Sequence, residues 1–159
     1  MSQQPEGVEL DMERIRHLWH GLLASQRQMK AEPRFREIHG LGPAETETLD
    51  WVAEHPDVIL RELGAALGTP KSTLTGLVDR LEKRGYLRRT INPRDRRSFG
   101  LVLTDPGRSA YAAHLRFEQA KWALSLQALG SRERLESFLA MLESITRAFL
   151  DRAAEAAHE

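Results

Sequence analysis

The sequence predicts a mainly α-helical protein with a small two- to three-stranded β-sheet, and three observations support this fold class. Apolar residues recur at three- and four-residue steps over most of the chain, as they do on one face of a helix. Two short segments, residues 86–91 and 98–103, have the composition of strands and are separated by a turn. Just before them, two short helical segments adjoin across a tight turn. This order predicts a winged helix-turn-helix with further helices at both ends.

The first helix is expected over about residues 8–28, because Glu32-Pro33 disfavours helical geometry at its end. Its apolar stripe consists of Met12, Ile15, Leu18, Trp19, Leu22 and Leu23. A second helix is expected from Gly42-Pro43, where proline suits the first turn, to His55-Pro56.

The helix-turn-helix is expected over residues 60–85. A short helix spans about Leu60 to Leu67 and closes at Gly68, a typical left-handed C-cap. Thr69 is predicted to cap the next helix, with Pro70 at its first position. That helix has one apolar face, made of Leu74, Leu77, Val78 and Leu81, and ends at Gly85.

The two strands are expected to form a hairpin around the turn at residues 92–97, which contains three arginines. In the second strand Phe99, Leu101 and Leu103 alternate with other residues, as in a half-buried strand. A long helix then runs from Thr104-Asp105-Pro106 to about Leu129, and Gly130 separates it from a last helix.

The charge is unevenly distributed, although 23 basic and 23 acidic residues give a formal net charge of zero. Residues 61–104 have a net charge of +6, residues 1–60 of −5 and residues 105–159 of −1. A basic block inside a neutral chain is typical of a nucleic-acid surface, although a solvated charged face has the same composition.

Several classes of protein are excluded or disfavoured. The chain has no cysteine, so it cannot form disulfides or thiolate metal sites. It contains no apolar run long enough to span a membrane and no signal-peptide pattern, so a cytoplasmic location is expected. No phosphate-binding loop, nucleophile elbow or HExxH motif is present, so neither an enzyme nor a bound cofactor is expected.

Residues 60–107 resemble the winged helix-turn-helix of the MarR (multiple antibiotic resistance regulator) family. Asp95-x-Arg97 and, after five further residues, Leu103-Thr104 match the family's wing signature, and Thr73, Thr75 and residues 77–85 match its recognition helix. The resemblance implies a homodimer that binds a pseudo-palindromic operator and usually acts as a repressor.

The expected DNA contacts come from two places. On the fourth helix the surface opposite the apolar face, with its flanks, presents small, hydroxyl and basic residues that suit the major groove: Lys71, Ser72, Thr73, Thr75, Gly76 and Arg80. By resemblance, Arg97 enters the minor groove, Asp95 holds the loop, and Arg94 and Arg96 contact the backbone. At Gly76 many family members have a larger polar or basic residue.

The expected domain organisation assigns residues 34–104 to DNA binding and residues 8–33 and 105–157 to helical dimerisation. The terminal helices have apolar stripes that need a partner, and a two-fold interface matches a palindromic site. Candidate interface residues are Val8, Leu10, Leu135, Leu139, Leu142, Ile145 and Phe149.

Other functions stay open. A small aromatic or phenolic ligand, which the resemblance implies, could bind near Arg16, Trp19, His20, His39 and Trp51, although these could equally be core and surface residues. A zinc-responsive regulator is an alternative, because Glu13, His17 and His20, and separately His114 and Glu118, have ligand spacing on a helix. A winged helix that binds only proteins is a third possibility.

Overall fold

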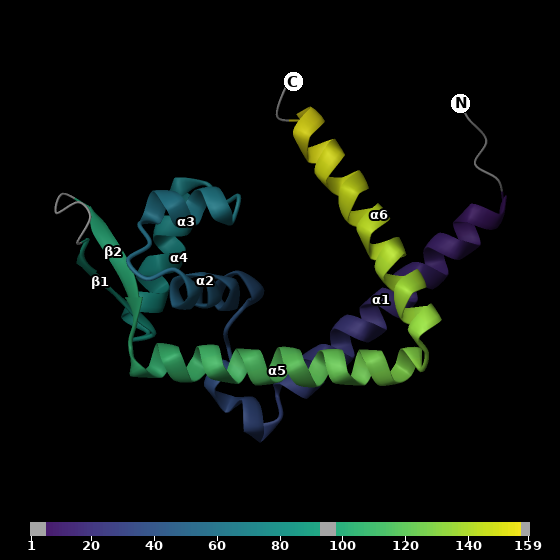
Figure 1. The fold of residues 1–159 in the computed structure, drawn as a ribbon, viewed down its shortest axis with the longest axis horizontal. Helices are drawn as coiled ribbons and strands as arrows, with labels where there is room; N and C mark the ends of the chain where they lie inside the picture. The colour runs from purple at the N-terminus through teal and green to yellow at the C-terminus, as the bar shows by residue number, and fades with distance from the viewer. Residues whose placement is uncertain (1–5, 93–97, 157–159) are drawn as a thin grey trace. The chain divides into compact units, whose positions relative to one another are not determined.

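The computed structural model describes residues 6–92 and 98–156, with the side chains of residues 6–10 excepted. The described elements confirm the predicted fold class of helices with a small β-hairpin, and their order appears in Figure 1. They are α1 (Glu6–Lys30), η1 (Pro33–Ile38), α2 (Pro43–Glu54), α3 (Leu60–Ala66), α4 (Lys71–Lys83), β1 (Leu87–Ile91), β2 (Phe99–Leu103), α5 (Asp105–Leu129) and α6 (Arg132–Ala156).

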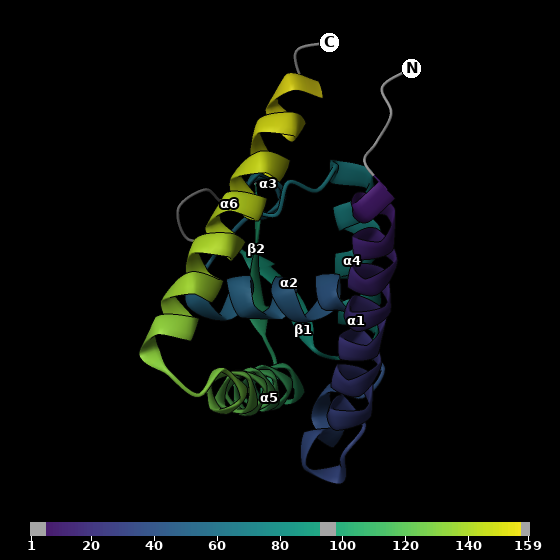
Figure 2. The ribbon, with the colours of Figure 1, turned by 90° about the vertical axis from the view of Figure 1, so that its right-hand side faces the viewer.

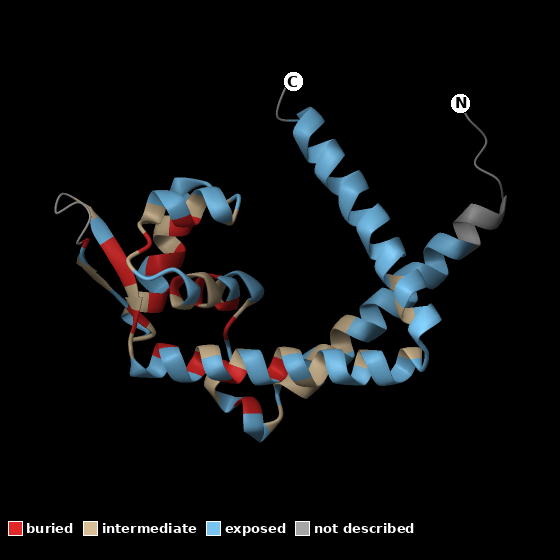
Figure 3. Cartoon of the chain, in the orientation of Figure 1, coloured by how far each residue is buried: buried red, intermediate tan, exposed pale blue. Residues whose placement is uncertain are grey.

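The chain forms two compact units, residues 1–118 and 119–159. In the first unit, α2, α3, α4 and the β1–β2 hairpin gather into one lobe, which is visible from two directions in Figures 1 and 2. Buried side chains concentrate in this lobe and along the start of α5, whereas α6 in the second unit has no buried residue and is mostly exposed (Figure 3).

The core of the lobe is built by the apolar faces that the sequence predicts. The whole predicted stripe of α4, from Leu74 to Leu81, is buried, as are Leu63 of α3 and Leu87 of β1, and α4 contacts both of these elements. Phe35 of η1 meets Phe117 of α5 edge to face at 5.4 Å between ring centroids. The prediction contains no element at residues 33–38, because one 3-10 turn has no periodic stripe.

The hairpin is antiparallel, with Leu87 opposite Leu103 and Ile91 opposite Phe99. A short bridge from Ile59 to Gly100 adds the beginning of a third strand. The strands are within one residue of their predicted ends. Leu101 and Leu103 are buried as the alternation indicates, whereas Phe99, the first residue of the predicted face, is 63% exposed.

The helix ends follow the predicted breakers, with one exception. Gly68, Gly85 and Gly130 all have positive φ, as expected of residues that follow a helix. The prediction that Thr69 caps α4 is wrong: Pro70 is the N-cap, and the Thr69 hydroxyl donates instead to the Leu67 carbonyl at 3.1 Å. The Thr69 hydroxyl therefore stabilises the turn between α3 and α4 and does not cap α4.

Candidate nucleic-acid interface

The exposed face of α4 is fixed by the burial of its opposite face. Because the apolar stripe is fully buried, Ser72, Thr73, Asp79 and Lys83 are turned to solvent. This is the surface that the sequence predicts for the major groove, and the lobe holds it in place through α3 and β1.

The hydroxyl groups on this face differ in availability. Thr75 Oγ1 donates to the Lys71 carbonyl at 2.8 Å, so its proton is used within the helix. The hydroxyls of Ser72 and Thr73 make no hydrogen bond to any residue that the structure describes. Their hydroxyls are therefore free to donate to an external acceptor.

Gly76 leaves space that Arg80 uses. A Cβ at Gly76 would lie 3.7 Å from Nη1 of Arg80, which is ordinary contact, so the guanidinium extends back over the glycine along the exposed face.

Two acidic groups near the interface pair with Arg89 of β1. Its guanidinium bonds to Asp79 at 2.6 Å and to Glu82, and both residues belong to α4. The hydrogen bond to Asp79, with the charges of both carboxylates, raises the pKa of Arg89 above its usual range. This pairing ties the hairpin to α4, and the one positive charge offsets part of the negative charge on the surface that would face a phosphate backbone.

Several basic side chains of the same region are unpaired. Among the residues that the structure describes, no ion pair involves Arg61, Lys71, Arg80, Lys83 or Arg88. The positive excess of the central block is therefore available to an external anion, whereas Arg84 is used internally by Glu45.

The end of β1 that leads into the turn of the hairpin is held by a buried asparagine that no sequence motif singles out. Asn92 is fully buried and donates from Nδ2 to the Asp57 carbonyl at 2.9 Å. Asp57 has a φ of 63°, which is unusual for a residue other than glycine, and Gly100 lies against its backbone. The only sequence signal was a polar residue at the end of a strand, directly before proline. The predicted wing contacts Arg94, Asp95, Arg96 and Arg97 lie outside the described residues.

The predicted ligand-binding residues lie in three places. Arg16 and His20 line a hollow of about 300 Å³ on α1 together with Glu13 and His17, and the exposed Trp19 lies on the same helix. His39 contacts the Glu32 carbonyl at 3.2 Å. The rings of Trp51 and His55 stack, with their centroids 4.0 Å apart.

The candidate metal ligands form no metal centre among the residues described, where no group of three or more His, Asp or Glu side chains could hold an ion. His114 lies between Asp50 at 2.9 Å and Glu118 at 3.7 Å, and so links α5 to α2. On the same side, burial and the charges of Glu54 and Asp50 raise the pKa of Tyr111.

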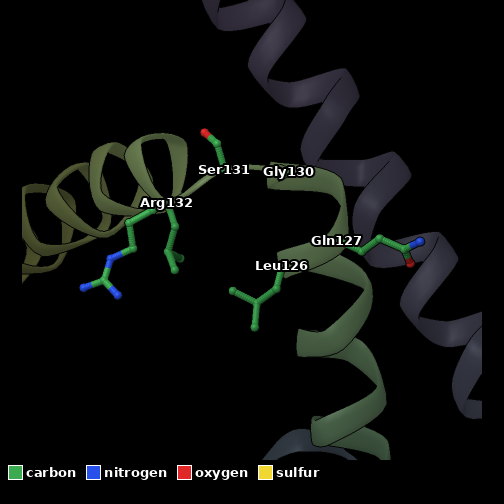
Figure 4. Close-up of a pocket in the computed structure, with 6 residues that line it drawn as sticks. Leu126, Gln127, Gly130, Ser131 and Arg132 are labelled. Carbon is green, nitrogen blue, oxygen red and sulfur yellow. The ribbon is translucent and has the colours of Figure 1, made fainter.

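A hollow of about 460 Å³ lies at the turn between α5 and α6 (Figure 4). Its lining combines leucines with Gln127, Ser131 and Arg132. Arg132 pairs with Glu136, and Ser131 Oγ accepts from the Arg134 amide, so its most polar groups are used locally.

Comparison with known proteins places the central part of the chain beside one family. The MarR family model matches residues 39–98, from the residue after η1 to the residue before β2. This part of the chain is similar to the MarR family, which confirms the resemblance carried by the α4 and wing motifs.

Individual relatives agree with this assignment. The HTH-type transcriptional repressor MdtR of Bacillus subtilis is 31% identical over 64% of this chain and 65% of its own length. The transcriptional repressor CouR, solved on a 23-mer DNA duplex, is 27% identical over 92% of this chain and 99% of its own, with a TM-score of 0.66. Streptococcus pneumoniae FabT, solved in complex with DNA, shares the fold with a TM-score of 0.73, 22% identity, and coverage of 92% of this chain and 99% of its own.

The matched part is shorter than the curated relatives: a regulatory protein of Thauera aromatica is covered over 60% of its length and MdtR over 65%. MdtR and CouR are named as repressors, which agrees with the expectation of a transcriptional regulator and not an enzyme. Within the described residues, no helix is both long and apolar enough to cross a bilayer.

Proposed function

We propose that this chain is a sequence-specific DNA-binding transcriptional regulator of the MarR family, a cytoplasmic, ligand-responsive repressor that binds a pseudo-palindromic operator as a homodimer. Residues 34–104 bind DNA, and residues 8–33 and 105–157 form the dimer. The observation that carries the proposal is the solvent-facing side of α4, where free hydroxyls and unpaired cations lie together.

The assigned contacts follow the physical character of each residue. Ser72, Thr73 and Gly76 let α4 approach the base edges, and Arg80 extends along the same face. Lys71 contacts a phosphate. The Thr75 hydroxyl donates its proton within the helix, so its oxygen can only accept a hydrogen bond from the DNA. In the wing, Arg97 enters the minor groove, Asp95 holds the loop, and Arg94 and Arg96 contact phosphates.

The dimer is supported by apolar surface on the terminal helices. On α6 the stripe at Leu139, Leu142, Ile145 and Phe149 is between 38% and 75% exposed, and the stripe on α1 is exposed to a similar extent. Helices with such faces need a partner in water. The side chains of Val8 and Leu10 are not among those that the structure describes.

The test is a binding series with genomic fragments and a random duplex from about 50 to 200 mM salt, the range in which phosphate contacts titrate. The proposal predicts that affinity falls by about 10³-fold or more, and that some fragments bind more tightly than the random duplex at every salt concentration. Binding that is absent, or independent of salt, would instead indicate a winged helix that contacts proteins.

A further inference from the structure

A hollow of about 420 Å³ lies between α3 and the beginning of α4. Its lining contains two cations and no acidic residue: Leu60, Arg61, Gly64, Ala65, Thr69 and Lys71. Lys71 belongs to the candidate interface, so the hollow is continuous with that surface, whereas Arg61 lies outside the sequence motifs.

Both cations are available to an external group. Neither Arg61 nor Lys71 makes an ion pair with a residue that the structure describes. The acidic neighbour Glu62 accepts the Ile59 amide at 3.2 Å.

The two helices that carry the cations are held rigidly. A Cβ at Gly64 would lie 3.3 Å from both Leu74 Cδ2 and the Thr69 carbonyl, so α3 and α4 approach closely at this point. The Thr69 amide donates to the Gly64 carbonyl at 3.0 Å, and Leu63 and Leu74 are fully buried. The backbone positions of the two cations are therefore fixed relative to each other, so binding one anion requires ordering of the two side chains alone.

We propose that Arg61 and Lys71 together clasp one phosphate group of the DNA backbone beside the groove that α4 enters. A phosphodiester fits because the remaining lining is small or apolar, with Thr69 already bonded to Leu67, so little is left to read a base. Arg61 thus positions α4 on the duplex. This inference rests on the proposed function, since it adds a contact to the same interface.

The experiment compares the parent chain with Arg61→Gln, Arg61→Lys and Arg14→Gln on a random duplex from about 50 to 200 mM salt. Arg14 lies exposed on α1 without an ion pair among the described residues, so its variant loses the same charge away from the hollow. Arg61→Gln is expected to flatten the slope of log affinity against log salt concentration by about one per bound copy. Between the two salt limits the parent should therefore lose about fourfold more affinity than Arg61→Gln does. Arg61→Lys should restore the slope, and Arg14→Gln should match the parent.

A double variant tests whether one phosphate is shared. Arg61→Gln with Lys71→Gln should lose less affinity than the two single variants predict together, because both residues act on one group. The inference is overturned if the affinity losses of the two single variants add in the double variant, or if Arg61→Gln has the same salt slope as Arg14→Gln. Both results assume a parent chain whose affinity falls steeply with salt. A parent chain that shows no salt-dependent binding contradicts the proposed function itself.

Discussion

Gly107, in the first turn of α5, shows how one residue can decide whether two segments meet. An added Cβ would lie 1.8 Å from the Tyr86 carbonyl oxygen, which no side-chain movement can relieve. The same carbonyl accepts the Thr104 amide at 3.1 Å, so the start of α5 is fastened where the glycine makes room. The close approach of α5 to the end of the helix-turn-helix therefore requires glycine here.

Gly107→Ala is expected to destabilise the protein by on the order of 3 kcal/mol, because backbone must move to admit the methyl group. Gly21→Ala is the matched control: nothing lies within 4 Å of its added Cβ in α1, so alanine should be neutral or should stabilise by about 0.5–1 kcal/mol. Thermal unfolding of both variants checks the pair, and equal melting temperatures would contradict the packing described here.

At the scale of elements, Arg89 of β1 adds ion pairs with two carboxylates of α4 to the apolar contact between these elements. The pairs are partly exposed, so their main effect is expected on the charge of the interface rather than on stability. Without Arg89, Asp79 would present an unpaired carboxylate on the face that approaches phosphates.

Arg89→Met should therefore weaken DNA binding by about 1 kcal/mol per subunit, and the double variant with Asp79→Asn should recover much of that loss. Binding at fixed salt, measured beside thermal unfolding, separates the two effects. An Arg89→Met loss that Asp79→Asn leaves unchanged would show that the arginine acts by another route.

Most elements could be predicted because their signals are local. Pro43, Gly68, Gly85 and Gly130 mark helix ends, and the burial of Leu74 to Leu81 follows from spacing alone. Distant pairings could not be predicted in this way. Arg89 with Asp79, Asn92 with Asp57, and the hollow at Arg61 all depend on how separate elements pack, which periodicity does not encode.

Thr69 shows that local signals also have limits. A threonine before proline has the pattern of an N-cap, yet the helix begins one residue later and the hydroxyl bonds within the preceding turn. Thr69 can either cap α4 or bond to Leu67, and the two arrangements shift the start of α4 by one residue. In the structure, where α3 packs against α4, the bond to Leu67 is formed.

At the scale of the whole molecule, the proposed assembly depends on the apolar face of α6, which has no buried residue among those described. Ile145→Asp should shift the protein from dimer to monomer in sedimentation, because a charge would enter the interface without a partner. Thr146→Asp, one exposed position along the same helix, should leave the dimer intact. A parent chain that sediments as a monomer and still binds DNA tightly would contradict the proposed assembly.

The central claim is that two copies of α4 read one two-fold DNA site. Footprinting of the parent chain on its tightest genomic fragment tests it most directly. We predict two protected stretches related by an inverted repeat, with centres about 10–10.5 base pairs apart, as expected of two recognition helices in successive major grooves. A single protected stretch without two-fold symmetry, or uniform protection along the fragment, would contradict the claim.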